Sequence, residues 1–134
     1  MKKIYNNIIP FRGFLALALW PFIFVRNEYA WSFDTSSERH EEIHGAQQKE
    51  MLLVFFLLWY GIEWLIKLCY YCNTITAYKN ISFEREAYEN QYNIVYLKQR
   101  KPYAWVKYIK AKKYDSTKPS GFTDKVTSAN STKL

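Results

Sequence analysis

Hydrophobic and polar positions predict a β-hairpin at the start of the chain. Residues 8–26 contain the apolar runs IIPFRGFLALALW and FIFVRN, which partly alternate and are joined near Trp20-Pro21. Short β-rich runs connected in this way are typical of a hairpin. We favour this prediction over a membrane-spanning helix, because Pro21 interrupts the apolar stretch 13–25 and a helical span needs about 20 apolar residues.

A helix is predicted to follow the hairpin. The segment FDTSSERHEEIHGAQQKEML, residues 33–52, places small polar and acidic residues before a mixed apolar and polar pattern. Ser36 or Ser37 can cap the first turn, and the acidic residues behind them favour the positive end of the helix dipole.

The segment MLLVFFLLWYGIEWLIKLCYYC, residues 51–72, is the most apolar part of the chain. It still contains Glu63 and Lys67, whose i,i+4 spacing allows them to pair on one helix face. Its hydrophobic length and its aromatic residues favour contact with a membrane. The alternative is a buried core helix in a small soluble protein.

Composition and charge define one folded domain with an anionic partner. The chain is 49% hydrophobic and 19% aromatic, which excludes disorder for most of its length, and its net charge is +7. Much of the positive charge lies between Lys98 and Lys113, where residues 101–114 predict a basic, aromatic helix that begins at Pro102. Such a helix can lie on an anionic membrane surface or contact nucleic-acid phosphates. Residues 1–114 are therefore the predicted domain, and the polar residues 115–134 are predicted to be a disordered tail.

The chain contains two histidines, His40 and His44, in the pentapeptide HEEIH. Residues at i and i+4 project from one face of a helix, so that both imidazoles can bind one ion. Glu41 then lies beside the ion, where it can accept a proton from a water whose pKa the metal lowers. HEEIH therefore predicts a zinc (Zn²⁺) site with Glu41 as the general base. The alternative is a solvated helix face, because further charged residues surround the pair.

A catalytic zinc site needs a third protein ligand, which must here be an acidic residue because no other histidine exists. The best candidate lies in NISFEREAYENQ, residues 80–91, where Ser82 can cap a short helix. On that helix Glu84 shares a face with Ala87, and Glu86 is the alternative ligand.

HEEIH followed by FEREAY resembles the gluzincin metallopeptidases, and in particular the compact, membrane-associated minigluzincins. The resemblance covers about residues 8–110. It implies His40, His44 and Glu84 as zinc ligands, a peptide or protein substrate held as an added strand on the hairpin, and a place at the bacterial inner membrane. Tyr88 stands where aspartate is common in this family, so that another acid such as Asp34 would have to orient a ligand.

The zinc hypothesis conflicts with a straight helix that spans a bilayer. Either the helix breaks, or the apolar segment is interfacial or buried, or the zinc hypothesis is wrong. A straight helix from His44 to Leu68 rises ~36 Å, whereas the segment from 69 to 83 returns only ~22 Å as a helix. Glu84 would then lie on the far side of a bilayer from the histidines. We therefore expect the helix to break near Tyr60-Gly61 and return. The predicted fold is α+β, with a hairpin followed by a mainly helical, zincin-like core.

The function expected from these features is zinc-dependent peptide-bond hydrolysis at a membrane. The alternatives are a zinc site with a purely structural role and a non-catalytic small membrane protein or adaptor with a basic C-terminal anchor. A nucleic-acid-binding module ranks last, because no recognised motif for it is present.

Overall fold

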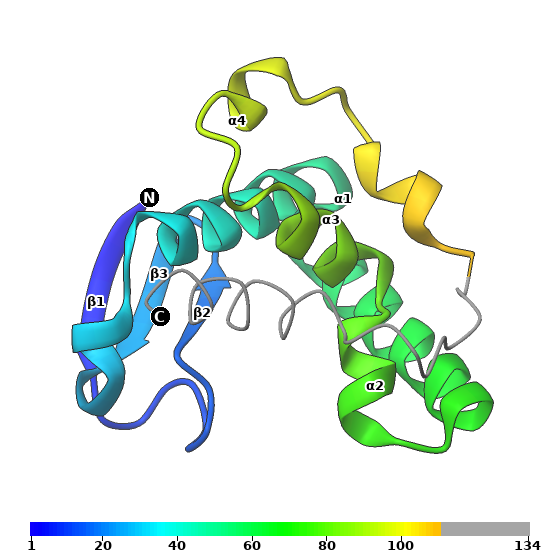
Figure 1. Ribbon diagram of the computed structural model, residues 1–134, viewed down its shortest axis with the longest axis horizontal. Coiled ribbons are helices and arrows are strands. Elements are labelled where there is room, and N and C mark those ends of the chain that lie inside the picture. The colour runs from blue at the N-terminus through cyan, green and yellow to red at the C-terminus, as the bar shows by residue number, and fades with distance from the viewer. Residues whose placement is uncertain (111–134) are drawn as a thin grey trace, which may run out of the picture.

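The computed structural model describes residues 1–110, and it has the α+β fold that the sequence predicts. A small sheet at the N-terminus packs beside a long helix, and shorter helices return along that helix (Figure 1). The elements in chain order are β1 (Lys2–Asn6), β2 (Ala16–Leu19), β3 (Phe22–Arg26), η1 (Asn27–Ser32), α1 (Thr35–Tyr71), α2 (Thr74–Lys79), α3 (Ser82–Asn90), α4 (Tyr96–Gln99) and η2 (Ala104–Tyr108).

The predicted hairpin is confirmed. Strands β2 and β3 are antiparallel, with Leu19 opposite Phe22 across the Trp20-Pro21 turn. The sequence did not predict β1, which pairs in parallel with β3 and makes the strand order β1-β3-β2. This strand is short and its side chains are mostly exposed, so that it lacks the alternation by which a strand is recognised.

The sheet meets α1 through two neighbouring features of the helix. Gln48 is buried and binds the outer edge of β2, donating to the carbonyl of Ala18 at 2.8 Å and accepting from the backbone N–H of Trp20 at 2.7 Å. Gly45 allows the start of the chain to approach, since a Cβ there would lie 2.5 Å from Sδ of Met1. The histidine half of α1 is thereby fixed against the hairpin.

Two details of α1 differ from the prediction. Its N-cap is Asp34, whose carboxylate accepts from the backbone N–H of Ser37 at 2.8 Å and from the hydroxyl of Ser36 at 2.7 Å. Its break lies at Leu52, with φ 57° and ψ 145°, and the expected break at Gly61 is wrong. The half of α1 before the kink contacts both the hairpin and α3, the half after it contacts α3 and the Thr74–Ser82 region, and the helix is continuous through Gly61.

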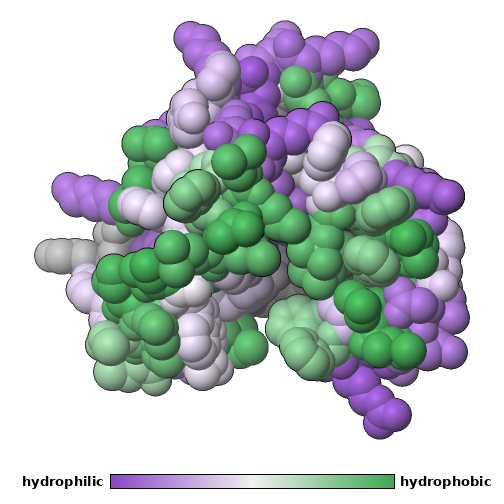
Figure 2. Space-filling view, turned by 180° about the vertical axis from the view of Figure 1, so that it is seen from behind, coloured by the Kyte–Doolittle hydropathy of each residue, from purple (hydrophilic) through white to green (hydrophobic). Residues whose placement is uncertain are grey.

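The half of α1 beyond Leu52 has its polarity inverted relative to a helix in a soluble protein. Most of its large apolar side chains are exposed, whereas Glu63 and Lys67 are buried and form the predicted ion pair at 2.7 Å. The most apolar 18-residue window of α1 has a mean hydropathy of 1.8, and only 17% of it is buried. That share does not support a buried core helix. By length and composition α1 is a candidate for membrane association, and Figure 2 shows hydrophobic residues on both sides of a hollow in the molecular surface.

The basic segment near the C-terminus does not form the predicted helix from Pro102. The chain forms the 3-10 helix η2 instead, directly after Tyr103 at φ 57°. Trp105 and Tyr108 are buried, and Trp105 joins the core cluster of Phe56, Ile81 and Phe83. Trp105 and Tyr108 therefore face the protein, whereas Tyr103 is 53% exposed. Residues 111–114 and the predicted tail 115–134 lie outside the described residues.

Candidate metal centre

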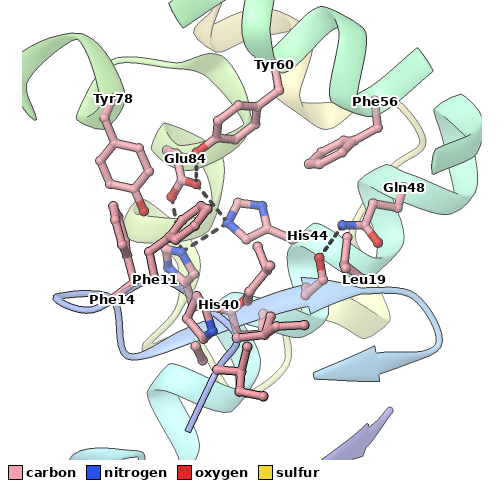
Figure 3. Close-up of a pocket in the computed structure, with 17 residues that line it drawn as sticks. Phe11, Phe14, Leu19, His40, His44, Gln48, Phe56, Tyr60, Tyr78 and Glu84 are labelled. Carbon is pink, nitrogen blue, oxygen red and sulfur yellow. Dashed lines mark hydrogen bonds and ion pairs between the residues drawn. The ribbon is translucent and has the colours of Figure 1, made fainter. Parts of the chain in front are cut away.

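The fold brings His40, His44 and Glu84 together, as the sequence predicts (Figure 3). The histidines lie on consecutive turns of α1, and Glu84 comes from the first turn of α3. The two Nε2 atoms are 3.1 Å apart. Nε2 of His40 lies 3.3 Å from Oε2 of Glu84, and Nε2 of His44 lies 3.3 Å from Oε1. All three side chains are buried.

These separations fit a zinc ion. Four ligands at about 2.0–2.1 Å around a tetrahedral zinc ion lie roughly 3.3–3.4 Å from one another. The Nε2–Nε2 separation of 3.1 Å and the two Nε2–oxygen contacts of 3.3 Å are close to that edge length, although each histidine contacts a different oxygen of Glu84. With one ligand atom taken from each side chain, the three atoms lie within 4.8 Å of one another. Three protein ligands also leave one tetrahedral position open, which is the arrangement of catalytic zinc sites.

The chemistry of the donor atoms calls for a cation. Nδ1 of His44 lies 2.8 Å from the amide oxygen of Gln47, and Nδ1 of His40 lies 2.9 Å from that of Gln91. An amide oxygen only accepts, so that both Nδ1 atoms carry the hydrogen and both neutral rings present an Nε2 lone pair. Oε2 of Glu84 is buried without a hydrogen-bond partner. Lone pairs thus converge on a point that a cation would satisfy.

The pKa shifts of His44 and Glu84 also indicate that the site needs positive charge. Burial lowers the pKa of His44, but the neighbouring Glu84 carboxylate outweighs burial and raises that pKa to about 9. Burial raises the pKa of Glu84, but the positive charge of a protonated His44 and the nearby imidazoles of His40 and His44 bring it well below its ordinary value. A proton on His44 therefore supplies positive charge to the site when no metal does.

A tyrosine beyond the helix kink binds the acidic ligand. The hydroxyl of Tyr60 donates to Oε1 of Glu84 at 2.8 Å. Burial beside that carboxylate raises the pKa of Tyr60, so that the hydroxyl keeps its proton. Tyr60 is thus a site residue that the sequence analysis missed, because only the fold places it near Glu84.

Within residues 1–110, no aspartate orients a ligand in the manner expected from the family resemblance. Tyr88 packs its ring against His40, with centroids 4.5 Å apart. The carboxylate of Asp34 caps α1 instead of approaching the histidines. The neutral side chains of Gln47 and Gln91 occupy the places where a carboxylate was expected.

Glu86, the alternative ligand, belongs to a separate buried cluster. Its carboxylate accepts from Nη2 of Arg100 at 3.1 Å, from the Tyr96 hydroxyl at 2.9 Å and from Nε2 of Gln47 at 2.9 Å. Its oxygens are therefore already occupied, and Glu84 is the acidic residue that faces the histidines.

Glu41 lines a cavity of about 430 Å³ beside the three candidate ligands. The opposite wall is formed by residues 8–11, Phe14 and β2, and Tyr78 and Phe56 close the ends (Figure 3). Burial raises the pKa of Glu41, and the positive charges of His44 and His40 together with a backbone hydrogen bond from Ala18 oppose that shift. The cavity is thus largely apolar, with a carboxylate and the candidate metal centre on one wall.

No protein-family model matches the chain, and no curated protein or solved structure matches it.

Proposed function

We propose that this protein is a zinc-dependent metallopeptidase that works at a membrane surface. The observation that carries the proposal is the convergence of His40, His44 and Glu84, whose ligand atoms lie within 4.8 Å of one another and include a buried carboxylate oxygen, Oε2, without a hydrogen-bond partner. The cavity beside them has room for part of a peptide. The resemblance of HEEIH and FEREAY to gluzincins supports the same activity.

When bound, zinc supplies a Lewis acid that polarises the scissile carbonyl and lowers the pKa of water. Glu41 accepts the proton of the attacking water and passes it to the leaving amine, so that one C–N bond breaks and one C–O bond forms. Burial raises the pKa of Glu41, which moves it in the direction of neutral pH. A group whose pKa lies near the working pH can both accept and donate a proton effectively. Tyr60 holds Glu84 in place through Oε1 and leaves Oε2 free for the metal.

The surface supports a location at a membrane. The exposed apolar side chains beyond Leu52 include Val54, Phe55, Leu58 and Ile66, each more than half exposed at 73%, 58%, 58% and 64%. A contiguous apolar surface of this kind marks a membrane or protein contact. The net charge of +7 favours an anionic bilayer. The bacterial inner membrane is the location that the family resemblance implies.

The exposed apolar helix also supports a second candidate, a non-catalytic membrane adaptor. An adaptor needs neither a metal nor the Glu41 carboxylate. The two candidates therefore differ in metal content and in their response to loss of Glu41.

The test is zinc stoichiometry by elemental analysis of the detergent-solubilised protein. We expect one zinc per chain in the wild type and in Glu41→Gln, and much less in His44→Ala and Glu84→Ala. Cleavage of a quenched peptide library should be lost in Glu41→Gln. It should persist in the matched control Glu42→Gln, whose carboxylate lies 3.9 Å from the chain's own N-terminal amine. Absence of zinc from the wild type would favour the adaptor.

A further inference from the structure

A glutamine connects the candidate metal centre to the buried cluster around Glu86. Gln47 is fully buried, three residues after His44 on α1, and its amide contacts both His44 and α3. We propose that Gln47 is a positioning residue that fixes the ring of His44 with its proton on Nδ1 and its lone pair on Nε2. This inference rests on the metal site proposed above.

The contacts of Gln47 decide which way its amide points. Its Nε2 donates to the carbonyl of Phe83 at 3.1 Å and to Oε2 of Glu86 at 2.9 Å. Both partners are acceptors, so that nitrogen must face them and oxygen must face His44. A flipped amide would lose two hydrogen bonds and would place its NH₂ group against the imidazole N–H. Nδ1 of His44 therefore has to be the donor in the 2.8 Å contact with Oε1.

Glu86 is held as a carboxylate, which keeps it an acceptor for Gln47. Arg100 donates to both of its oxygens and Tyr96 donates to Oε1. Arg100 also pairs with Glu50 on α1. Glu86 and Arg100 are both buried, with side-chain exposures of 0% and 4%. A buried ion pair contributes little net stability, because desolvation offsets its attraction. Here the pair of Glu86 and Arg100 fixes which groups donate: Gln47 donates to Glu86, and His44 donates to Gln47.

A neutral amide at this position has a consequence for the charge of the site. Two neutral imidazoles and one carboxylate carry a single negative charge in total. A carboxylate in place of Gln47 would add a second one close to the ligands and would make the imidazole more basic. Gln47 orients His44 without this added charge, so that a divalent ion together with its three ligands keeps a net positive charge next to Glu41.

The neighbouring glutamine supplies a matched control. Gln48 is also buried on α1 and also uses both ends of its amide, but its partners are Ala18 and Trp20 of the hairpin. Gln47→Met and Gln48→Met therefore remove the same group from adjacent buried positions. The measurement is zinc affinity by competition with a chromophoric chelator. We expect a loss of about 10–100-fold for Gln47→Met and a clearly smaller loss for Gln48→Met, because Gln48 fixes α1 against the hairpin but contacts neither histidine. Equal affinities for the two variants would overturn the proposal.

A spectroscopic readout tests the same inference in the wild type, should Gln47→Met fail to fold. The chain has two histidines, so that a long-range ¹H–¹⁵N spectrum of the zinc-loaded protein contains two imidazole systems. For His44 we expect coordination through Nε2 and a slowly exchanging proton on Nδ1. Coordination through Nδ1, or an Nδ1 proton that exchanges freely with water, would refute the inference while leaving the metal site intact. A wild type without zinc would refute both proposals.

Discussion

The buried pair of Glu63 and Lys67 allows a quantitative test of the inverted helix. Glu63 accepts from Lys67 at 2.7 Å, from Trp59 Nε1 at 3.1 Å, and from Ser82 through its N–H at 2.8 Å and its hydroxyl at 2.6 Å. The substitution Glu63→Met removes all four acceptor contacts and leaves the Lys67 ammonium with the carbonyl of Asn80. Removing one partner of a buried pair lowers the free energy of unfolding by about 3–5 kcal/mol, and the orphaned donors of Ser82 add to that. We therefore expect a loss of about 4 kcal/mol or more, a large part of a typical domain's stability.

The double variant Glu63→Met/Lys67→Met separates charge burial from packing. It removes both charges, so that most of the loss should be recovered and about 1–2 kcal/mol should remain for the unpaired Ser82 donors. Urea unfolding in a mild detergent, followed by tryptophan fluorescence, measures the free energy of unfolding of the wild type, Glu63→Met, Lys67→Met and the double variant. These four values complete a double-mutant cycle. As a surface control, Lys3→Met breaks an exposed pair with Glu38 and should produce no resolvable change. Additive effects of the two single substitutions, or a small effect of Glu63→Met, would show that the pair is not buried as described.

Three further predictions concern the helix and its surface. Gly61→Ala should raise the free energy of unfolding by up to about 1 kcal/mol, because a Cβ there meets nothing within 4 Å in a continuous helix. A decrease in the free energy of unfolding would indicate that the helix breaks at Gly61 after all. Leu52→Gly should relieve the backbone strain at the observed kink. Leu58→Lys should reduce the fraction of protein that sediments with anionic vesicles, whereas Ile94→Lys, at an exposed residue outside α1, should not. Equal effects of the two variants would show that α1 does not contact the membrane. Asp34→Ala should lower stability by about 1 kcal/mol in urea unfolding. Hydrogen bonds from Ser36 and Ser37 lower the pKa of Asp34, so that its contribution should be present above pH 3.8 and lost as the pH falls through the lowered folded-state value.

The local parts of the site were predictable from the sequence. His40 and His44 share a face because they are four apart on one helix, and this geometry needs no knowledge of the tertiary fold. Glu84 follows by the exclusion of other histidines and by its place on the face of a second helix. The hairpin was predictable for the same reason, since alternation and a turn act over a few residues.

The partners that orient the ligands depend on contacts between distant segments. Gln47 contacts Phe83, and Gln91 reaches back to His40, across separations of 36 and 51 residues. Nothing in the local sequence marks these glutamines, and the acidic candidate Asp34 is the stronger local signal for a ligand partner. Tyr60 likewise contacts Glu84 only after the chain has reversed direction.

The position of the break shows tertiary packing overriding local preference. Gly61 is the weakest helix former in the apolar segment, whereas Leu52 is among the best. The chain nevertheless bends at Leu52, where α1 leaves the hairpin and continues along α3 through the stacked rings of Phe56 and Phe83. A leucine at positive φ is strained, so that these packing contacts must outweigh the strain.

The same contacts decide how the apolar half of α1 can meet a bilayer. From Leu52 to Tyr71 the helix is about 30 Å long, enough to span. Yet one stripe of it is bound along its length, with Tyr60 to Glu84, Lys67 to Asn80 and Trp64 to the carbonyl of Thr74.

A span would take α2, α3 and the irregular backbone between them into hydrocarbon, where unpaired peptide groups are too costly. The bound stripe therefore argues against a full span of this helix. Its exposed apolar face remains available for membrane association, while Tyr60 on the bound stripe contacts Glu84 of the candidate metal centre.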